Sequence, residues 1–168
     1  MPDSSHSLVG EGADVGILGG LVVAAWFLVL DAIAGHPFQT PSLLGQVVIF
    51  GDPTPDPTRI SFGAIVLYTA FHFIVFALVG MGLVALVHWG IENPVVRYAL
   101  LPLFLVFELM FYGLLGVLAE GTRELFPFWA VVTANTLAAA CMAAFLWRRH
   151  PALRKSIHDT PLGAAPLH

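Results

Sequence analysis

Four long apolar runs dominate this chain of 168 residues. They cover residues 15–34, 60–89, 95–119 and 126–147. A helix needs about 20 apolar residues to cross a hydrocarbon core about 30 Å thick, and it satisfies its own backbone hydrogen bonds, as the bilayer interior requires. All four runs reach or approach this length. The sequence therefore predicts an all-α integral membrane protein, a bundle of four membrane-spanning helices.

The composition excludes several classes of protein. Charged residues make up 11% of the chain, whereas a typical soluble domain has about 25%. Seven lysines and arginines with a net charge of −4 are too few for a nucleic-acid surface. The expected partners are therefore the lipid bilayer and other membrane proteins or a second copy of the chain, with no nucleic acid. The single cysteine, Cys141, excludes a disulfide within the chain, and we interpret it as a packing residue.

The chain divides into three parts around these runs. Residues 1–14 form a polar N-terminus, residues 15–147 form the four-span domain, and residues 148–168 form a tail that is basic at first and then flexible. The N-terminal part has no lysine or arginine, which a secretory signal would carry, so we expect the first run to be retained as a span.

The basic residues predict the orientation. Four spans place both termini on one side of the membrane, and Arg59 and Arg123 fall on the other side. The remaining basic residues share the side of the termini: Arg97, Arg148, Arg149, Arg154 and Lys155. The positive-inside rule then predicts a multi-pass protein of the cell inner membrane with both termini in the cytoplasm.

Residues at the ends of the runs are the expected interface anchors. Trp89 and Trp147 would mark the cytoplasmic interface and Trp129 the outer one, because amphipathic rings prefer this depth. Arg148 and Arg149 begin a basic stretch that would lie at anionic head groups.

The first outer loop, residues 35–59, contains the signal of a short helix. Thr40 suits the N-cap position, and Pro41 suits the first helical position. Residues 42–50 are too few to span the membrane, so they would lie flat at the outer interface or cover the end of the bundle. Residues 51–58 contain three prolines and predict a stiff connector or an arm that contacts a partner. Asp31, just before this loop, would reach head groups or water.

The first run carries small residues at a spacing of four. Gly16, Gly20 and Ala24 would share one helix face, where small side chains let another backbone approach closely. This stripe predicts helix packing within the bundle, and self-association is the alternative.

Polar residues inside the spans form the candidate site. Counted from the outer boundary at 1.5 Å per residue, His72 lies ~18 Å deep, Glu108 ~16 Å and Asn135 ~14 Å. The three are therefore expected to meet in one buried polar layer. Other polar residues share their helix faces at three- or four-residue spacing: Tyr68, Thr69 and Tyr112.

Three interpretations of this layer remain open. It is a hydrogen-bonded clasp that fixes the helix arrangement, a functional site for a proton, an ion or a small ligand, or a surface that faces a partner protein. Burial would raise the pKa of Glu108 and a nearby His72 would lower it, so the sequence leaves the charge of Glu108 open.

The motifs of common enzymes are absent from the sequence. The chain has no Walker loop, no dinucleotide-binding turn, no His-Glu-x-x-His and no nucleophile elbow. We therefore assign no catalytic residue and expect no enzyme of these classes. A metal site needs several close ligands, and none is expected here. No cofactor is predicted, although the sequence leaves a bound lipid or quinone open.

Three hypotheses of function follow. The first is an accessory or structural subunit of a larger membrane complex, because the chain is small and its outer segment has little to pack against. The second is a small proton-coupled carrier with His72 and Glu108 as the coupling pair. The third is a redox subunit that contacts a quinone or a pigment, because phenylalanines flank both polar residues: Phe71, Phe73 and Phe76, then Phe104, Phe107 and Phe111.

Overall fold

The computed structural model describes residues 8–93, 113 and 126–151, and these residues form helices and loops with no strand. The elements are α1 (Leu8–Ile33), α2 (Gln39–Leu44), the π-helix η1 (Gly45–Ile49), α3 (Phe62–Glu92) and α5 (Phe128–Arg149). Within this part of the chain, α1, α3 and α5 are long and apolar enough to cross a membrane. The all-α class and the membrane assignment are thereby supported. The predicted span 95–119 lies outside the described residues except for Gly113.

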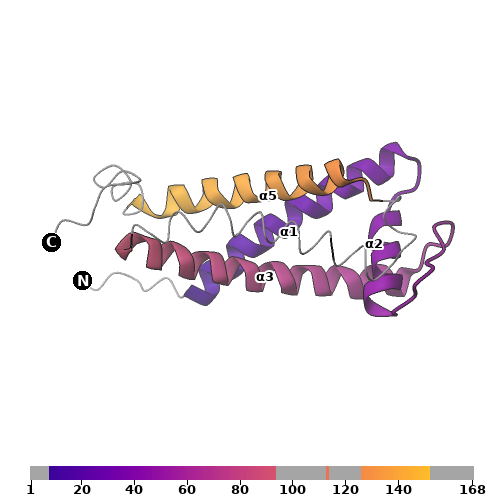
Figure 1. The fold of residues 1–168 in the computed structure, drawn as a ribbon, viewed down its shortest axis with the longest axis horizontal. Coiled ribbons are helices and arrows are strands. Elements are labelled where there is room, and N and C mark those ends of the chain that lie inside the picture. Colours follow the sequence, from indigo (N-terminus) through magenta and orange to yellow (C-terminus); the bar gives the residue numbers. More distant parts are fainter. Residues whose placement is uncertain (1–7, 94–112, 114–125, 152–168) are drawn as a thin grey trace.

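Helix α1 runs antiparallel to α3 and α5 and contacts both (Figure 1). At one end, Glu11 near the start of α1 meets His150, which follows α5. At the other end, the indole nitrogen of Trp26 donates to the carbonyl oxygen of Ala130 near the start of α5, at 3.0 Å. We call the end with Glu11 and His150 the inner end, and the end with α2 the outer end.

Near the inner end, α1 and α3 pack backbone against backbone. A Cβ added to Gly16 would lie 2.6 Å from the Cα of Ala77, and one added to Gly80 would lie 2.7 Å from the Cα of Gly16. A real side chain at either position would overlap the neighbouring helix. Glycines at these sites thus permit the close approach that small-residue faces allow in membrane helices.

Helix α1 begins at Leu8, inside the segment expected to be a polar cytoplasmic N-terminus. Glu11 and Gly12 are buried. Glu11 can enter the bundle because His150 Nε2 donates a hydrogen bond to its Oε1 at 2.8 Å. A paired carboxylate tolerates burial that an unpaired one does not. The ring of His150 in turn packs edge-on against His88, with ring centroids 5.1 Å apart.

Glu11→Ala is expected to lower the free energy of unfolding by about 1–3 kcal/mol, because it leaves His150 without its acceptor. Glu11→Gln should lose less, since a glutamine carbonyl oxygen still accepts from His150 Nε2. Thermal unfolding in detergent measures both changes. Unchanged stability in both variants would show that the hydrogen bond contributes nothing.

At the outer end, Asp31 is buried instead of reaching head groups or water. Its Oδ2 accepts from the backbone N–H of Thr40 at 2.8 Å, and its Oδ1 accepts from the Thr40 hydroxyl at 2.7 Å. The predicted N-cap is also wrong, because α2 begins at Gln39 and Phe38 stands at the N-cap position. Thr40 uses its hydroxyl to hold α2 against the end of α1.

The short segment α2–η1 packs over the outer end of α3 rather than lying free. Ser42 ties the two elements together, because its Oγ accepts from the backbone N–H of Ser61 at 2.9 Å. Gly45 lies so close to α3 that an added Cβ would be 2.7 Å from the carbonyl carbon of Ala64. Residues 42–47 are buried. Of the two positions expected for this segment, the structure therefore favours a cover on the bundle.

The connector between η1 and α3 is mostly exposed, and its turns are held by local hydrogen bonds. The Thr58 hydroxyl and backbone N–H donate to Asp56 Oδ1 at 2.7 and 2.8 Å. These bonds, the hydroxyl first, hold the pKa of Asp56 below its usual value. The connector therefore keeps a negative charge at the outer end.

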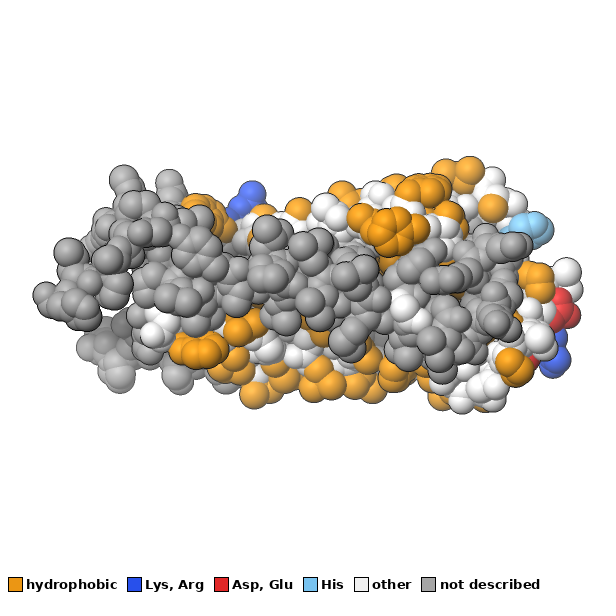
Figure 2. Space-filling view, in the orientation of Figure 1, with side chains coloured by type: hydrophobic (Ala, Val, Ile, Leu, Met, Phe, Trp, Pro, Cys, Tyr) orange, Lys and Arg blue, Asp and Glu red, His pale blue; other side chains and the backbone are white. Residues whose placement is uncertain are grey.

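The expected interface anchors lie at the two ends. Trp89, Trp147, Arg148 and Arg149 are exposed at the inner end, and Trp129 is exposed at the outer end, where its ring packs edge-on against Trp26. Among the described side chains visible in Figure 2, hydrophobic groups lie along the two long borders of the molecule, and the charged groups lie toward the two ends of the described part. This distribution matches a bundle that spans a bilayer.

Candidate functional site

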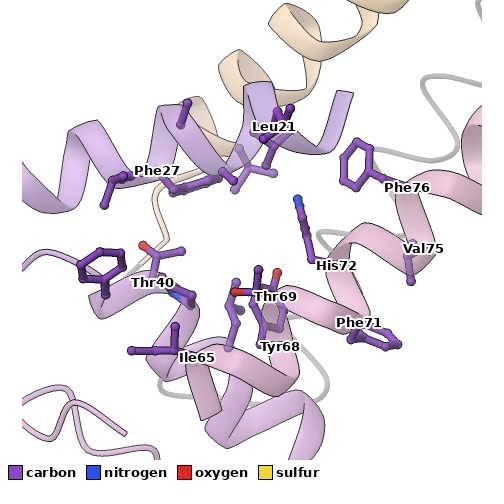
Figure 3. A pocket seen from close by; sticks show the side chains of 18 of the residues that line it. Leu21, Phe27, Thr40, Ile65, Tyr68, Thr69, Phe71, His72, Val75 and Phe76 are labelled. Carbon is purple, nitrogen blue, oxygen red and sulfur yellow. The ribbon is translucent and has the colours of Figure 1, made fainter. Parts of the chain in front are cut away.

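A cavity of about 420 Å³ lies toward the outer end, between α1, α2, α3 and α5. Figure 3 shows side chains from α1, α2 and α3 pointing into one space, with Leu21 and Phe27 facing His72, Tyr68 and Thr69. Phe126, Val131 and Asn135 complete the lining from the part of the chain around α5.

The cavity begins where the close glycine packing stops. Gly12, Gly16 and Gly20 lie against α3, and an added Cβ on Gly20 would still be 3.1 Å from the ring of Phe73. One turn further along α1, Ala24 is exposed and lines the cavity. The two helices therefore separate beyond Gly20, and α2 closes the wedge at the outer end.

The cavity walls are apolar and rich in aromatic rings. Five aromatic side chains from α1, α3 and the start of the α5 region contribute: Phe27, Tyr68, Phe71, Phe76 and Phe126. No Asp, Glu, Lys or Arg is among the described residues that line it. Such a wall favours an apolar or neutral occupant, because a charge in apolar surroundings needs a partner.

His72 is the polar residue that joins α3 to α1. Its Nε2 lies 3.1 Å from the carbonyl oxygen of Gly20. A carbonyl oxygen only accepts, so Nε2 carries the proton, and in the neutral ring Nδ1 is then an acceptor. The imidazole also packs against Phe76, with ring centroids 4.6 Å apart. Its position is fixed by these two contacts.

Asn135 carries an unsatisfied donor. Its Nδ2 is buried and has no hydrogen-bond partner in the described part of the protein. Buried polar groups in folded proteins nearly always have partners, and an orphaned donor costs about 1–3 kcal/mol. Asn135 also lines the cavity, so this donor is among the polar groups of the cavity lining.

Hydroxyl groups supply the remaining polarity. Tyr68 packs its ring near His72, with centroids 6.0 Å apart, and Thr69 lies beside it on α3 (Figure 3). Thr40 also lines the cavity, but its hydroxyl already donates to Asp31. Tyr68 and Thr69 are thus the hydroxyls that face the cavity without a hydrogen bond among the described residues.

Four residues of the expected polar layer line this one cavity: Tyr68, Thr69, His72 and Asn135. The other two, Glu108 and Tyr112, lie outside the described residues. The expected clasp through Glu108 stays a prediction. Its described members do not bond to each other, since His72 contacts Gly20 instead.

The sequence patterns did not predict that residues of the outer loop line the cavity. Phe38, Thr40, Pro41 and Leu44 line the cavity, although they belong to the segment interpreted as a cover or an interfacial helix. Ala24 was assigned to helix packing, and it instead lines the cavity. The sequence offered one indication of this contribution, namely that a short apolar helix was expected at the end of the bundle near the polar residues of the spans.

The described residues give no support for a metal site. They contain no group of three or more His, Cys, Asp or Glu side chains placed to hold a metal ion. Cys141 is a free, half-buried thiol on α5.

Comparison of the chain with protein-family models, with curated proteins and with solved structures finds no match.

Proposed function

We propose that this integral membrane protein binds a neutral, largely apolar molecule from the bilayer in the cavity between α1, α2, α3 and α5. The observation that carries this proposal is the cavity itself. Its volume of about 420 Å³ lies within the range of roughly 300–1,000 Å³ that is typical of small-molecule sites. Those sites are mostly apolar, with a few fixed polar groups, which is also the make-up of this cavity.

The opening of the cavity supports a ligand that comes from the membrane. Leu21, Leu28 and Phe71 line the cavity and are themselves more than 40% exposed on the flanks of α1 and α3. In a bilayer these flanks face acyl chains. An apolar tail can therefore leave the cavity sideways without meeting water.

Local backbone strain beside the cavity gives further support. Phe38, which lines the cavity, has a φ of 70°. This left-handed conformation is unusual for a bulky residue and costs about 1–3 kcal/mol, and such strain gathers at functional sites. The π-helix η1 follows α2 directly, and π-helical turns are also frequent at functional sites.

Ala24→Phe is expected to remove the bound molecule by filling the cavity. Ala24 is a small, exposed residue of the lining, so a phenyl ring there adds apolar bulk to the site. The protein is extracted from its membrane in mild detergent, and its bound small molecules are measured by mass spectrometry relative to the bulk lipids. The wild type should carry an enriched, stoichiometric ligand that Ala24→Phe lacks.

Ala143→Phe is the matched control. Ala143 is an exposed alanine on α5 that does not line the cavity, so the same substitution there should leave the ligand bound. A wild-type protein with only bulk lipids in their membrane proportions would overturn the proposal. Equal loss of the ligand in both variants would overturn it as well.

The membrane topology is part of the proposal. We place four spans in the inner membrane with both termini in the cytoplasm, which makes the inner end of the bundle cytoplasmic. The support is the position of Arg148 and Arg149 at the same end as the start of α1. The positive-inside rule then sets the orientation.

An accessory subunit of a larger membrane complex is the second candidate. One reason for this role was that the outer segment had little to pack against, and the burial of residues 42–47 removes that reason. A different observation favours it, because Phe50, Ile60 and Phe62 are at least half exposed at the outer end, beside the charged connector. Stoichiometric co-purification of a larger membrane protein, lost on Phe62→Ser, would support this role. The proton-coupled carrier requires Glu108, which lies outside the described residues, and stays a prediction.

A further inference from the structure

We infer that the ligand is a neutral molecule with a carbonyl-bearing ring on an apolar tail, the chemistry of an isoprenoid quinone, and that Asn135 donates to a carbonyl of that ring. This inference rests on the proposed function, since it names the class of molecule that the cavity binds. It is carried by the buried donor of Asn135, the aromatic walls and the absence of charge among the described lining residues.

The lack of charged side chains among the described lining residues favours a neutral head group. A fatty-acid carboxylate or a phospholipid phosphate in this cavity would need a cation, and the described lining residues offer none. The two buried acidic side chains of α1 are already paired, Glu11 with His150 and Asp31 with Thr40. A cationic head group would therefore find no free carboxylate in the described lining either.

The buried amide selects an oxygen acceptor. Nδ2 of Asn135 can only donate, and in the described protein it donates to nothing. A pure hydrocarbon would leave this donor unpaired, whereas a carbonyl oxygen satisfies it. The ligand must therefore present a hydrogen-bond acceptor, such as a carbonyl oxygen, to α5 at the depth of Asn135.

Helix α3 supplies a second polar contact. Across from α1, the Tyr68 hydroxyl can donate or accept, and His72 Nδ1 accepts in the neutral ring. A ring with two oxygen atoms can contact both α5 and α3, in the carbonyl or the hydroxyl form. Phe76 and Phe71, which also line the cavity from α3, suit the faces and edges of such a ring. A quinone ring meets all of these requirements together.

Asn135→Leu tests the inference with a change that keeps the branching of the side chain at Cγ and removes its polar atoms. The delipidated protein is titrated with decylubiquinone and, separately, with decylbenzene, which has a ring and a chain but no oxygen. Quenching of tryptophan fluorescence gives the Kd for the quinone, and native mass spectrometry gives occupancy for both probes. We expect Asn135→Leu to raise the Kd for decylubiquinone about tenfold, because the carbonyl loses its donor. Binding of decylbenzene should not weaken.

Thr136→Val is the matched control, since Thr136 is exposed on the same helix and does not line the cavity. It should leave both affinities unchanged. The melting temperature of ligand-free Asn135→Leu should equal or exceed that of the wild type, because a buried unpaired donor is removed. A lower melting temperature with an unchanged Kd would mean a structural clasp and would overturn the inference. Asn135→Ala repeats the test if the leucine variant does not fold.

The outcomes separate the inference from the proposed function. If Ala24→Phe abolishes binding of both probes while Asn135→Leu leaves the quinone affinity unchanged, the cavity binds apolar molecules and the carbonyl assignment is wrong. Decanoate binding more tightly than decylubiquinone would also overturn the neutral, carbonyl-bearing class. If neither decylubiquinone nor decylbenzene binds the wild type, both proposals fail.

Discussion

Gly80→Ala is expected to lower the free energy of unfolding by about 3 kcal/mol or more, at the top of the range for overpacked cores. The added methyl group would overlap the carbonyl oxygen of Gly12 and lie 2.5 Å from the backbone nitrogen of Gly16. These atoms belong to the backbone of α1, so no side-chain rotation can relieve the overlap. The two helices must move apart, which weakens the core of Val15 and Val84 beside the contact. Unfolding by a denaturing detergent measures the loss.

Gly82→Ala provides a control two residues away on the same helix. An added Cβ on Gly82 meets nothing within 4 Å, and alanine favours a helix over glycine by about 0.5–1 kcal/mol. This variant should therefore be as stable as the wild type or slightly more stable. If the two variants behave alike, α1 and α3 do not pack through glycine backbones.

The approach of α1 to α3 could be foreseen from sequence only in part. Gly16 and Gly20 stood out by their spacing of four, and both lie against α3. Ala24 continues the same spacing but lines the cavity instead. A stripe of small residues indicates which helix face permits close contact. It does not indicate where the crossing helices separate, because the crossing depends on the partner helix and on α2.

The candidate site could likewise be predicted from the sequence only in part. His72 and Asn135 were singled out because polar groups inside a span are costly. In the structure, His72 contacts the Gly20 carbonyl, and the Asn135 Nδ2 has no partner among the described residues. Both outcomes depend on the packing of three helices. Phe38 and Thr40 reach the cavity only because the chain turns back at Gly35, whose φ is 81°. No periodic pattern marks such a turn.

Asp31→Ala is expected to cost about 2–4 kcal/mol of stability at the outer end. It leaves the backbone N–H and the hydroxyl of Thr40 without an acceptor, and Thr40 is only 8% exposed. Hydrogen bonds to a charged group contribute about 1.5–3 kcal/mol, and an unpaired buried donor adds its desolvation penalty. Asp31→Asn should lose much less, because its oxygen can accept from the N–H while its amide donates to the threonine hydroxyl. Thermal unfolding gives the two values.

The same variant tests whether the outer end shapes the cavity. Asp31 does not line the cavity, but it fixes Thr40, and Thr40 does line it. Asp31→Ala should therefore weaken ligand retention as well as stability, and Asp31→Asn should largely restore both. Asp14→Ala, at an exposed position on the same helix, should change neither. A loss of stability with full retention of the ligand would mean that the cavity keeps its shape without the Asp31–Thr40 contact. Loss of both together would show that the turn between α1 and α2 holds the cavity closed at its outer end.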